Sequence, residues 1–436
     1  MLAADAPLPR LRLGALQALP FDGLTKGLPF GAGGITPAQV AARGWNLLAG
    51  DLPLPAAVIR EDILRANSRW MAAFTAANGL RIAPHGKTTM APGLFDLQAA
   101  DGAWAITAAT AQQVAVCRRF GVARVLLANQ PVGRETVEFL VSCLSGADRI
   151  ELYCLADSAE GVAALATATA AAPPPADNPL RVLVEVGVAG GRTGARDHDA
   201  ALAVARAVAA APGLELAGVE CFEGILPDAA AVERLVDEVV AIARAVDAEG
   251  LVAADRPLVL TAGGTAFFDR VGERFGAARF DRPVLRILRS GCYLTHDTMG
   301  YARAFARIRA ETTLTLPEGG LEAALEVWAL VQSRPEPGRA ILTMGKRDIG
   351  FDAGLPRPVR WFRPGMPGPA PMPEGHEVVA LNDQHAHMTL PDDSPLTFGD
   401  MVAFGIGHPC TTFDRWQLIW LVDSRYGVTN ALRTFF

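Results

Sequence analysis

The chain has 436 residues and a formal net charge of -6. A chain of this length can bury a large core and commonly folds as two domains. Its charges are dispersed rather than gathered in blocks, which argues against nucleic acid or an anionic membrane surface as the main partner. The segment Met1–Leu13 holds acids and prolines without an unbroken apolar run, so we expect no signal peptide. Six cysteines without paired spacing are typical of a reducing compartment, and we expect a cytoplasmic protein.

Short apolar runs alternate with stretches of helical period, such as Ala111–Phe120 and Ala229–Ala248, over most of the first 290 residues. This alternation predicts a parallel sheet with crossover helices. The number of units, and the lack of a nucleotide fingerprint after the first run, favour a (β/α)8 TIM-type barrel over a doubly wound sheet. The apolar runs are Ala56–Ile59, Leu80–Ala83, Trp104–Ala108, Val125–Ala128, Ile150–Leu155, Val182–Val186, Leu214–Val219, Pro257–Thr261 and Val284–Leu288.

The pattern changes after about residue 307, where short β-like runs are separated by turns rich in proline and glycine. Such runs predict a smaller antiparallel β domain. We therefore divide the chain into an N-terminal segment of unassigned packing (1–45), a barrel (46–307) and a C-terminal β domain (308–436). The β-like runs are Thr312–Leu316, Ala324–Val331, Arg339–Met344, Val378–Leu381 and Met401–Phe404.

Lys87 is one of only three lysines, the others being Lys26 and Lys346. A neutral lysine amine can attack a carbonyl, which the permanently charged arginine cannot do. Lys87 follows a short extended run that ends at a proline, a placement that indicates the C-terminal mouth of a barrel strand. Reactive groups of this fold lie there. Lys87 is thus a candidate catalytic residue, and the alternative is a surface lysine beside a turn.

Glycine-containing turns follow the last two predicted barrel strands, at Thr261–Thr265 and Arg289–Tyr293. Glycine lets backbone N–H groups approach an anion, and a helix N-terminus adds a favourable dipole. Two such turns on the last strands of a barrel form the usual phosphate site. A third turn, Glu185–Gly194, carries Arg192, which can reach an anion or a ring nitrogen. The alternative for Arg192 is a solvated side chain on a flexible loop.

Histidine and cysteine gather in two segments of the predicted β domain, Asn382–His387 and Gly407–Cys410. The spacing of His408 and Cys410 places both on one side of an extended strand. Imidazole and thiolate suit zinc, and a site with fewer than four protein ligands stays open for substrate. The alternative is a satisfied histidine beside a buried cysteine. His198 and His376 lack such neighbours and are expected to be ordinary polar residues.

Together these motifs resemble those of the D-serine dehydratase / D-threonine aldolase family, whose members are alanine-racemase-like, fold-type III pyridoxal-phosphate enzymes. The likeness runs from about residue 55 to the end and is greatest for the bacterial amino acid deaminases. Thr89 and Met90 stand where the family usually has histidine and lysine, and Asp383-Gln384 replaces the usual acidic pair. The motifs are Pro84–Thr89, Gly190–Gly194, Ala262–Thr265, Gly291–Tyr293, Asn382–His385 and Gly407–Cys410.

The resemblance implies a homodimeric lyase that uses pyridoxal 5'-phosphate (PLP) and Zn2+ and acts on a small D-amino acid. It implies that Lys87 holds PLP as a Schiff base and moves the Cα proton. His85 would line the cofactor, and Arg192 would face its pyridine nitrogen. The implied phosphate ligands are Gly263, Gly264, Thr265, Ser290, Gly291 and Tyr293. The implied zinc ligands are His408 and Cys410, and a part for His385 or His387 stays open.

The resemblance also bears on the reaction. PLP serves as an electron sink and zinc as a Lewis acid for a departing β-hydroxyl group. A β-hydroxy D-amino acid, such as D-serine or D-threonine, would then give a 2-oxo acid and ammonia. In this family a His-x-Cys motif accompanies dehydratases and a His-x-Asp motif accompanies aldolases, so Cys410 favours elimination over cleavage to glycine and an aldehyde. Three further hypotheses stay open: a racemase using Tyr293 or Tyr301, a non-catalytic PLP-binding protein, and a purely structural zinc site.

Overall fold

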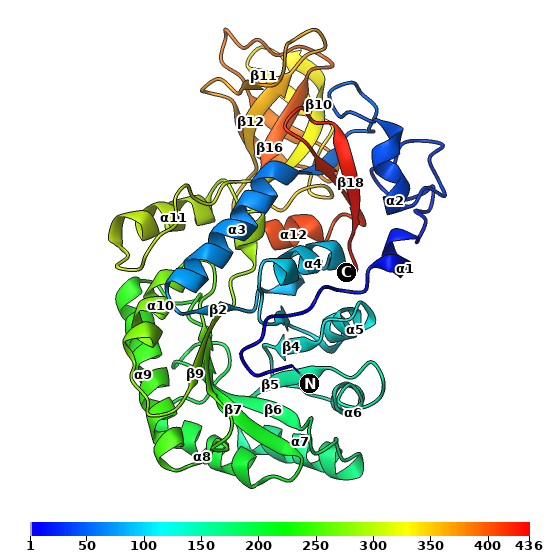
Figure 1. Cartoon of the computed structure of the whole chain (residues 1–436). Helices are drawn as coiled ribbons and strands as arrows, with labels where there is room; N and C mark the ends of the chain where they lie inside the picture. Colours follow the sequence, from blue (N-terminus) through cyan, green and yellow to red (C-terminus); the bar gives the residue numbers. More distant parts are fainter. Residues whose placement is uncertain (1) are drawn as a thin grey trace.

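Two sheets form the two ends of an elongated molecule in the computed structural model, which describes residues 2–436 (Figure 1). One sheet has eight parallel strands, and the other has ten strands that are mostly antiparallel. Helix α3 (Glu61–Ala77) and the short helix α12 (Pro409–Phe413) lie between them (Figure 1). None of the helices in the described part of the chain is long and apolar enough to cross a membrane.

The eight parallel strands form a barrel with the order β2-β9-β8-β7-β6-β5-β4-β3. The sheet closes between β2 and β3, because the N–H of Trp104 donates to the carbonyl of Ile82 at 2.8 Å and that of Thr107 to Pro84 at 2.9 Å. The predicted barrel, rather than a doubly wound sheet, is thereby confirmed. The barrel strands are β2 (Arg81–Ile82), β3 (Ile106–Ala108), β4 (Arg124–Leu127), β5 (Glu151–Ala156), β6 (Leu180–Val186), β7 (Leu214–Cys221), β8 (Leu258–Ala262) and β9 (Val284–Leu288).

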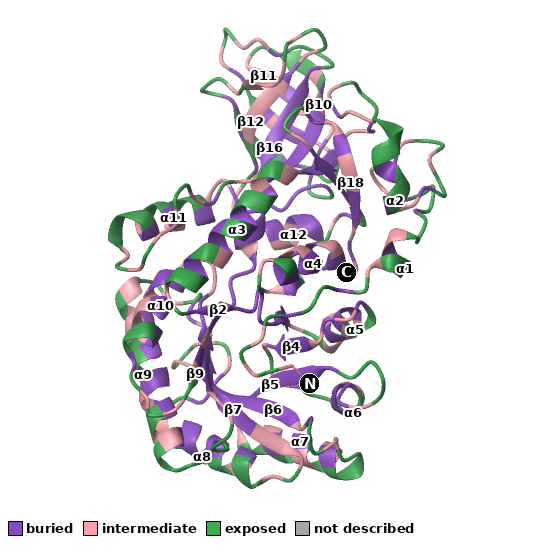
Figure 2. Ribbon diagram, in the orientation of Figure 1, coloured by how far each residue is buried: buried purple, intermediate pink, exposed green. Residues whose placement is uncertain are grey.

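Helices cover the outside of the barrel and leave its strands buried, as the colouring in Figure 2 shows. Burial on both faces explains why these strands appear in the sequence as unbroken apolar runs rather than as alternating patterns. The covering helices are α4 (Pro92–Ala100), α5 (Ala111–Arg119), α6 (Arg134–Ser142), α7 (Ala159–Ala171), α8 (His198–Ala210), α9 (Ala229–Ala248) and α10 (Phe268–Ala277).

The second sheet confirms the predicted antiparallel β domain and draws one strand from far upstream. Its main path is β13-β12-β16-β10-β1-β17-β18, with β11, β15 and β14 added at the side of β10. The strands are β1 (Ala56–Arg60), β10 (Leu325–Glu336), β11 (Arg339–Leu342), β12 (Arg357–Phe362), β13 (Ala370–Pro371), β14 (Glu377–Leu381), β15 (Ala386–Thr389), β16 (Met401–Gly405), β17 (Leu418–Val422) and β18 (Val428–Arg433).

Two strand assignments made from the sequence are wrong. The run Ala56–Ile59 is β1, which pairs with β10 and β17 in the second sheet, so it is not a barrel strand. The run Thr312–Leu316 forms no strand, because Thr312 and Thr313 donate hydrogen bonds to Glu273 of α10 and hold this segment on the barrel wall. The sheet therefore includes a strand from before the barrel, and the proposed boundary at residue 46 does not separate the two sheets.

The N-terminal segment packs against both parts of the molecule. The N–H of Leu8 donates to the carbonyl of Ala103 at 2.8 Å, and that of Arg12 donates to Phe120 at 3.0 Å, both on the barrel. Phe21 and Val40 belong instead to a buried cluster formed with the second sheet. The segment contains the short helices α1 (Gly14–Gln17) and α2 (Pro37–Val40) and the 3-10 helix η1 (Ala41–Arg43).

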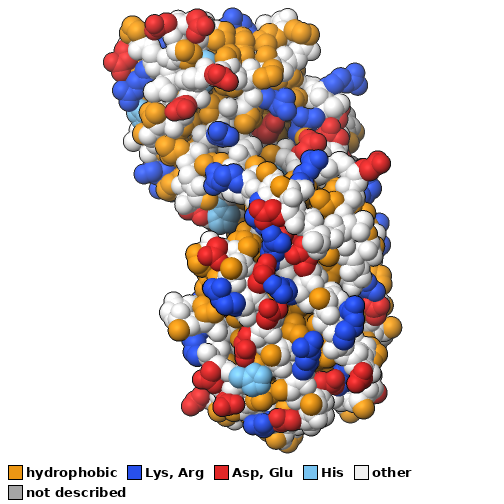
Figure 3. Space-filling model, turned by 90° about the vertical axis from the view of Figure 1, so that its left-hand side faces the viewer, with side chains coloured by type: hydrophobic (Ala, Val, Ile, Leu, Met, Phe, Trp, Pro, Cys, Tyr) orange, Lys and Arg blue, Asp and Glu red, His pale blue; other side chains and the backbone are white. Residues whose placement is uncertain are grey.

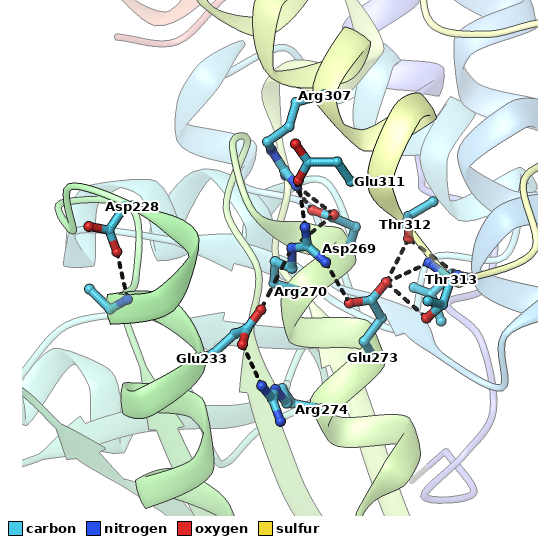
Figure 4. Close-up of polar contacts among 12 residues, drawn as sticks. Asp228, Glu233, Asp269, Arg270, Glu273, Arg274, Arg307, Glu311, Thr312 and Thr313 are labelled. Carbon is cyan, nitrogen blue, oxygen red and sulfur yellow. Dashed lines mark hydrogen bonds and ion pairs between the residues drawn. The ribbon is translucent and has the colours of Figure 1, made fainter.

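Acidic and basic side chains intermix along the barrel wall that carries α9, α10 and α11 (Gly300–Glu311) (Figure 3). The fully buried Asp269 of α10 forms two hydrogen bonds with Arg307 of α11, at 2.6 and 2.9 Å (Figure 4). Arg270 pairs with Glu311 at 2.6 Å, and Arg274 pairs with Glu233 of α9. These contacts join the last barrel helices to α11, which leads into the second sheet.

Candidate active site

Lys87 lies at the barrel end that faces the second sheet. Strand β2 ends at Ile82, and Pro84 directs the chain into the 3-10 helix η2 (Gly86–Thr88), which carries Lys87. Gly86 and Thr88 are buried, whereas the side chain of Lys87 is exposed. Helix α12 of the second sheet packs against η2. The lysine is therefore held on a fixed backbone with its amine free, at the junction of the two parts of the molecule.

His85 is the nearest candidate neighbour of Lys87 in the chain. Its ring atom Nδ1 is buried without a hydrogen-bond partner in the described structure. Burial, followed by the positive charges of Lys87, Arg289 and Arg192, holds the pKa of His85 well below its usual value. A neutral imidazole at neutral pH can line a flat aromatic ligand and accept a hydrogen bond. It is not an acid at this pH.

The turn after β8 is fixed by a carboxylate that we did not identify from the sequence. The N–H groups of Gly264 and Gly263 donate to Glu223 at 2.6 and 3.1 Å. Glu223 is fully buried and forms no ion pair within residues 2–436. The hydroxyl of Ser290 donates to the carbonyls of Gly263 and Gly264, at 2.9 Å each. These three residues, proposed as phosphate ligands, are therefore brought together, but much of their hydrogen-bonding capacity is used within the protein.

Two other members of the proposed phosphate site keep free donors. The backbone N–H groups of Thr265 and Gly291 donate to no protein acceptor in the described chain. A Cβ atom added at Gly291 would lie 2.7 Å from the carbonyl oxygen of His85, so only glycine allows the two turns to approach so closely. Tyr293 is directed elsewhere, because its buried hydroxyl accepts a hydrogen bond from Gln98 of α4 at 3.2 Å. The free donors thus come from backbone rather than from Tyr293.

Arg192 lies on the loop after β6, with its guanidinium 4.6 Å from the centre of the Phe222 ring. Its positive charge is one of the causes that lower the pKa of His85. Deeper in the barrel, Arg289 forms an ion pair with Glu220 at 2.6 Å. Burial raises the pKa of Glu220 to about 7, although Arg289 acts in the opposite direction. This buried ion pair was not predicted from the sequence.

His408 is the N-cap residue of α12, and Cys410 is the second residue of that helix, with its Sγ 3.4 Å from the hydroxyl of Thr88 on η2. His408 uses Nδ1 to contact Asp352 at 2.6 Å. A hydrogen bond with Cys410, and another with Asp352, raises the pKa of His408 to about 9. Hydrogen bonds with Cys292, His408 and Thr88 lower the pKa of Cys410. A carboxylate on the far nitrogen of a histidine is a common feature of metal sites.

The remaining histidines behave differently. Both ring nitrogens of His387 are used, by Arg339 at 2.8 Å and Asn382 at 2.6 Å. His198 contacts Glu238, and His376 contacts Ser394, which confirms that these two are ordinary polar residues. In residues 2–436, no group of three or more His, Cys, Asp or Glu side chains is arranged to hold a metal ion.

Two protein-family models match different parts of the chain. The family model "Alanine racemase, N-terminal domain" matches residues 59–303, and "Putative serine dehydratase domain" matches residues 324–422. A 3-hydroxy-D-aspartate aldolase of Paracoccus denitrificans is 24% identical over 70% of this chain and 75% of its own length. A D-threonine aldolase of Arthrobacter is 26% identical over 76% of this chain and 78% of its own length.

Solved structures agree with these matches. The crystal structure of D-threonine aldolase from Filomicrobium marinum is similar with a TM-score of 0.72 and 25% identity, over 92% of this chain and 98% of that one. The D-threo-3-hydroxyaspartate dehydratase from Delftia has a TM-score of 0.65 and 20% identity, over 89% of this chain and 99% of that one. The dehydratase likeness shows a shared fold.

Proposed function

We propose that this chain, which belongs to the D-serine dehydratase / D-threonine aldolase family of fold-type III PLP enzymes, is a D-amino acid ammonia-lyase that uses PLP and zinc. Its substrate would be a β-hydroxy D-amino acid such as D-serine or D-threonine, and its products a 2-oxo acid and ammonia. The observation that carries the proposal is the pair His408 and Cys410 on α12, the helix that packs against η2 and brings Cys410 to 3.4 Å from Thr88, the residue after Lys87.

The residues at the barrel mouth fit PLP. Thr265 and Gly291 supply unpaired backbone N–H groups for its phosphate, at the barrel end where phosphate sites form. The neutral ring of His85, with its unpartnered Nδ1, suits the side of an aromatic ring. PLP supplies an electron sink for a carbanion at the substrate Cα. Lys87 would hold the cofactor and, once free, take the Cα proton.

The residues on α12 fit zinc. Neutral imidazole and thiolate are its preferred ligands, and Asp352 orients His408 for binding. A site with two protein ligands leaves positions open for substrate oxygen, where zinc supplies Lewis acidity. The similar structures include two single variants of D-threo-3-hydroxyaspartate dehydratase. In one a histidine is replaced by alanine, and in the other a cysteine two positions later is replaced by alanine and the protein is in a metal-free form. The spacing of His408 and Cys410 is the same.

An aldolase is the second candidate, because both curated relatives are aldolases. In that reaction the same site would cleave the substrate to glycine and an aldehyde. A racemase has less support, since it needs a second acid/base at the substrate. The hydroxyl of Tyr293 is bound to Gln98, and the ring of Tyr301 is buried. We also propose a homodimer, on the resemblance. A cytoplasmic location is proposed because the six cysteines are all free thiols.

Product analysis tests the proposal. The protein loaded with PLP and zinc is incubated with D-threonine, and the products are followed by NMR. We expect 2-oxobutanoate and ammonia, and none with L-threonine. Glycine and acetaldehyde would identify an aldolase and overturn the elimination. Exchange of the Cα proton with solvent, without either set of products, would overturn both and favour a racemase.

A further inference from the structure

Two thiols meet at the junction of the barrel and the second sheet. The Sγ atoms of Cys292 and Cys410 lie 3.9 Å apart, although the residues are separated by 118 positions in the chain. Cys292 begins the 3-10 helix η3 (Cys292–Leu294) after β9, and Cys410 lies on α12. The hydroxyl of Thr88 touches both, at 3.4 Å from Cys410 and 3.9 Å from Cys292. The contact is thus built from three separate segments.

These two cysteines also differ from the others in exposure. Cys117, Cys143, Cys154 and Cys221 are buried, whereas Cys292 and Cys410 are partly exposed. A small oxidant in solution can therefore reach this pair more readily than any other thiol of the chain. The proposed function uses Cys410 as a metal ligand but gives Cys292 no part.

We propose that Cys292 and Cys410 are a modification site, at which hydrogen peroxide joins them in a reversible disulfide that removes Cys410 from the metal site. The Cys410 thiolate attacks one oxygen of hydrogen peroxide, a sulfur–oxygen bond forms as the oxygen–oxygen bond breaks, and the product is a sulfenic acid. The hydroxide that leaves takes up the proton lost from the Cys410 thiol and becomes water. The Cys292 sulfur then attacks that sulfur, and the oxygen leaves as water with the thiol proton. In total the two thiols lose two electrons and two protons to one peroxide, which becomes two waters.

Closing the disulfide requires the two sulfur atoms to move together. A disulfide sulfur–sulfur bond is roughly 2.0 Å long, so the present gap of 3.9 Å must shorten. Rotation about the Cα–Cβ bonds of the two cysteines moves the sulfurs over such distances. The bond would tie the barrel turn after β9 to α12, and Cys410 could then no longer bind a metal ion as a thiolate. Zinc bound at Cys410 should conversely protect the pair from oxidation.

The test counts thiols and maps the bond. Metal-free protein is treated with hydrogen peroxide, denatured and titrated for free thiols, and its unreduced peptides are analysed by mass spectrometry. We expect the count to fall from six per chain to four, with one linkage between Cys292 and Cys410 that a thiol reductant reverses. Protein loaded with zinc before treatment should keep more thiols over the same time.

The Cys292→Ser variant is the matched control. It should form no linkage and instead retain a sulfenic acid at Cys410 that a trapping reagent labels. Six free thiols after peroxide treatment, a linkage that involves any other cysteine, or irreversible oxidation of Cys410 in the parent would overturn the proposal. This inference rests on the proposed function only for its effect on the metal. If the reduced protein neither binds zinc nor forms 2-oxo acid, the function fails while the mapped linkage still stands.

Discussion

Charged side chains on the outer wall of the barrel are paired, whereas several polar groups at its mouth have no protein partner. On the wall, Asp269, Arg270 and Arg307 each meet an opposite charge at close range (Figure 4). At the mouth, the amine of Lys87 is exposed, Nδ1 of His85 has no partner, and the backbone N–H of Thr265 has no protein acceptor. Buried polar groups in proteins are almost always paired.

The difference separates stability from function. Paired charges on the wall hold α10 against α11, and a change there should affect folding without altering chemistry. A buried polar group without a partner at the mouth, such as Nδ1 of His85, costs stability unless a ligand satisfies it. A change there should affect ligand binding and reaction more than folding. The following changes test this division.

The largest effect is expected at Lys87. In Lys87→Ala, the group proposed to take the Cα proton is absent, so kcat should fall by about 1,000-fold or more. The thermal midpoint should stay near that of the parent, because the side chain is exposed. Lys346→Ala, which also removes an exposed lysine, is the control and should keep kcat within about twofold of the parent. Equal losses in both variants would remove Lys87 from the site.

On the wall, Asp269→Asn should destabilise the fold. The substitution leaves the guanidinium of Arg307 without its buried carboxylate, which costs about 3 kcal/mol. Urea unfolding measures the change, and the kcat of the folded variant should stay unchanged. Glu311→Gln, at the exposed end of the same network, should cost less than about 1 kcal/mol. A large loss of activity in folded Asp269→Asn protein would break the division.

His296 should make stability fall in acid. Burial lowers its pKa from the usual 6.5 to about 4, so the folded state holds it neutral. As the pH falls from 6.5 towards 4, the unfolded state binds the proton first, and up to about 3 kcal/mol of stability is lost. Unfolding curves of the parent and of His296→Asn should diverge in this window. Asparagine tolerates the φ of +55 found here. Parallel curves would show that protonation of His296 does not cause the loss of stability in this pH window.

The smallest effect concerns Asp352. Asp352→Asn weakens the contact that orients His408 but leaves the proposed ligands in place. Zinc affinity should fall by about 10- to 100-fold, as for other partners of metal-bound histidines. Competition with a chelator measures it. Asp414→Asn is the control. Asp414 lies at the other end of α12 from His408 and pairs with Arg415, so its substitution should leave zinc affinity unchanged. An unchanged affinity in Asp352→Asn would separate the carboxylate from the metal.

The fold was largely predictable, because alternating apolar runs and helical stretches are properties of neighbouring residues. The error at Ala56–Ile59 has a physical cause. Strand β1 is buried on both faces in the centre of the second sheet, so its sequence looks the same as that of a barrel strand. The run Thr312–Leu316 misled because its threonines contact Glu273 rather than a neighbouring strand.

Residue type alone made Lys87, His408 and Cys410 candidates for the site, and their roles stay predictions. Residues whose part depends on distant neighbours were missed. Cys292 meets Cys410 across 118 positions, and Asp352 meets His408 across 56. Glu223 looked like one more acid after a strand, and only folding shows it against the N–H groups of Gly263 and Gly264. No local pattern in the sequence carries these contacts.

The central claim is that the unpaired groups at the mouth are a PLP site built on Lys87. The most direct test is to load the protein with PLP, reduce it with borohydride, digest it and map the modified lysine by mass spectrometry. We expect the pyridoxyl group on Lys87 and on neither Lys26 nor Lys346, the other two lysines of the chain. A label on either of those lysines, or no covalent label, would contradict it.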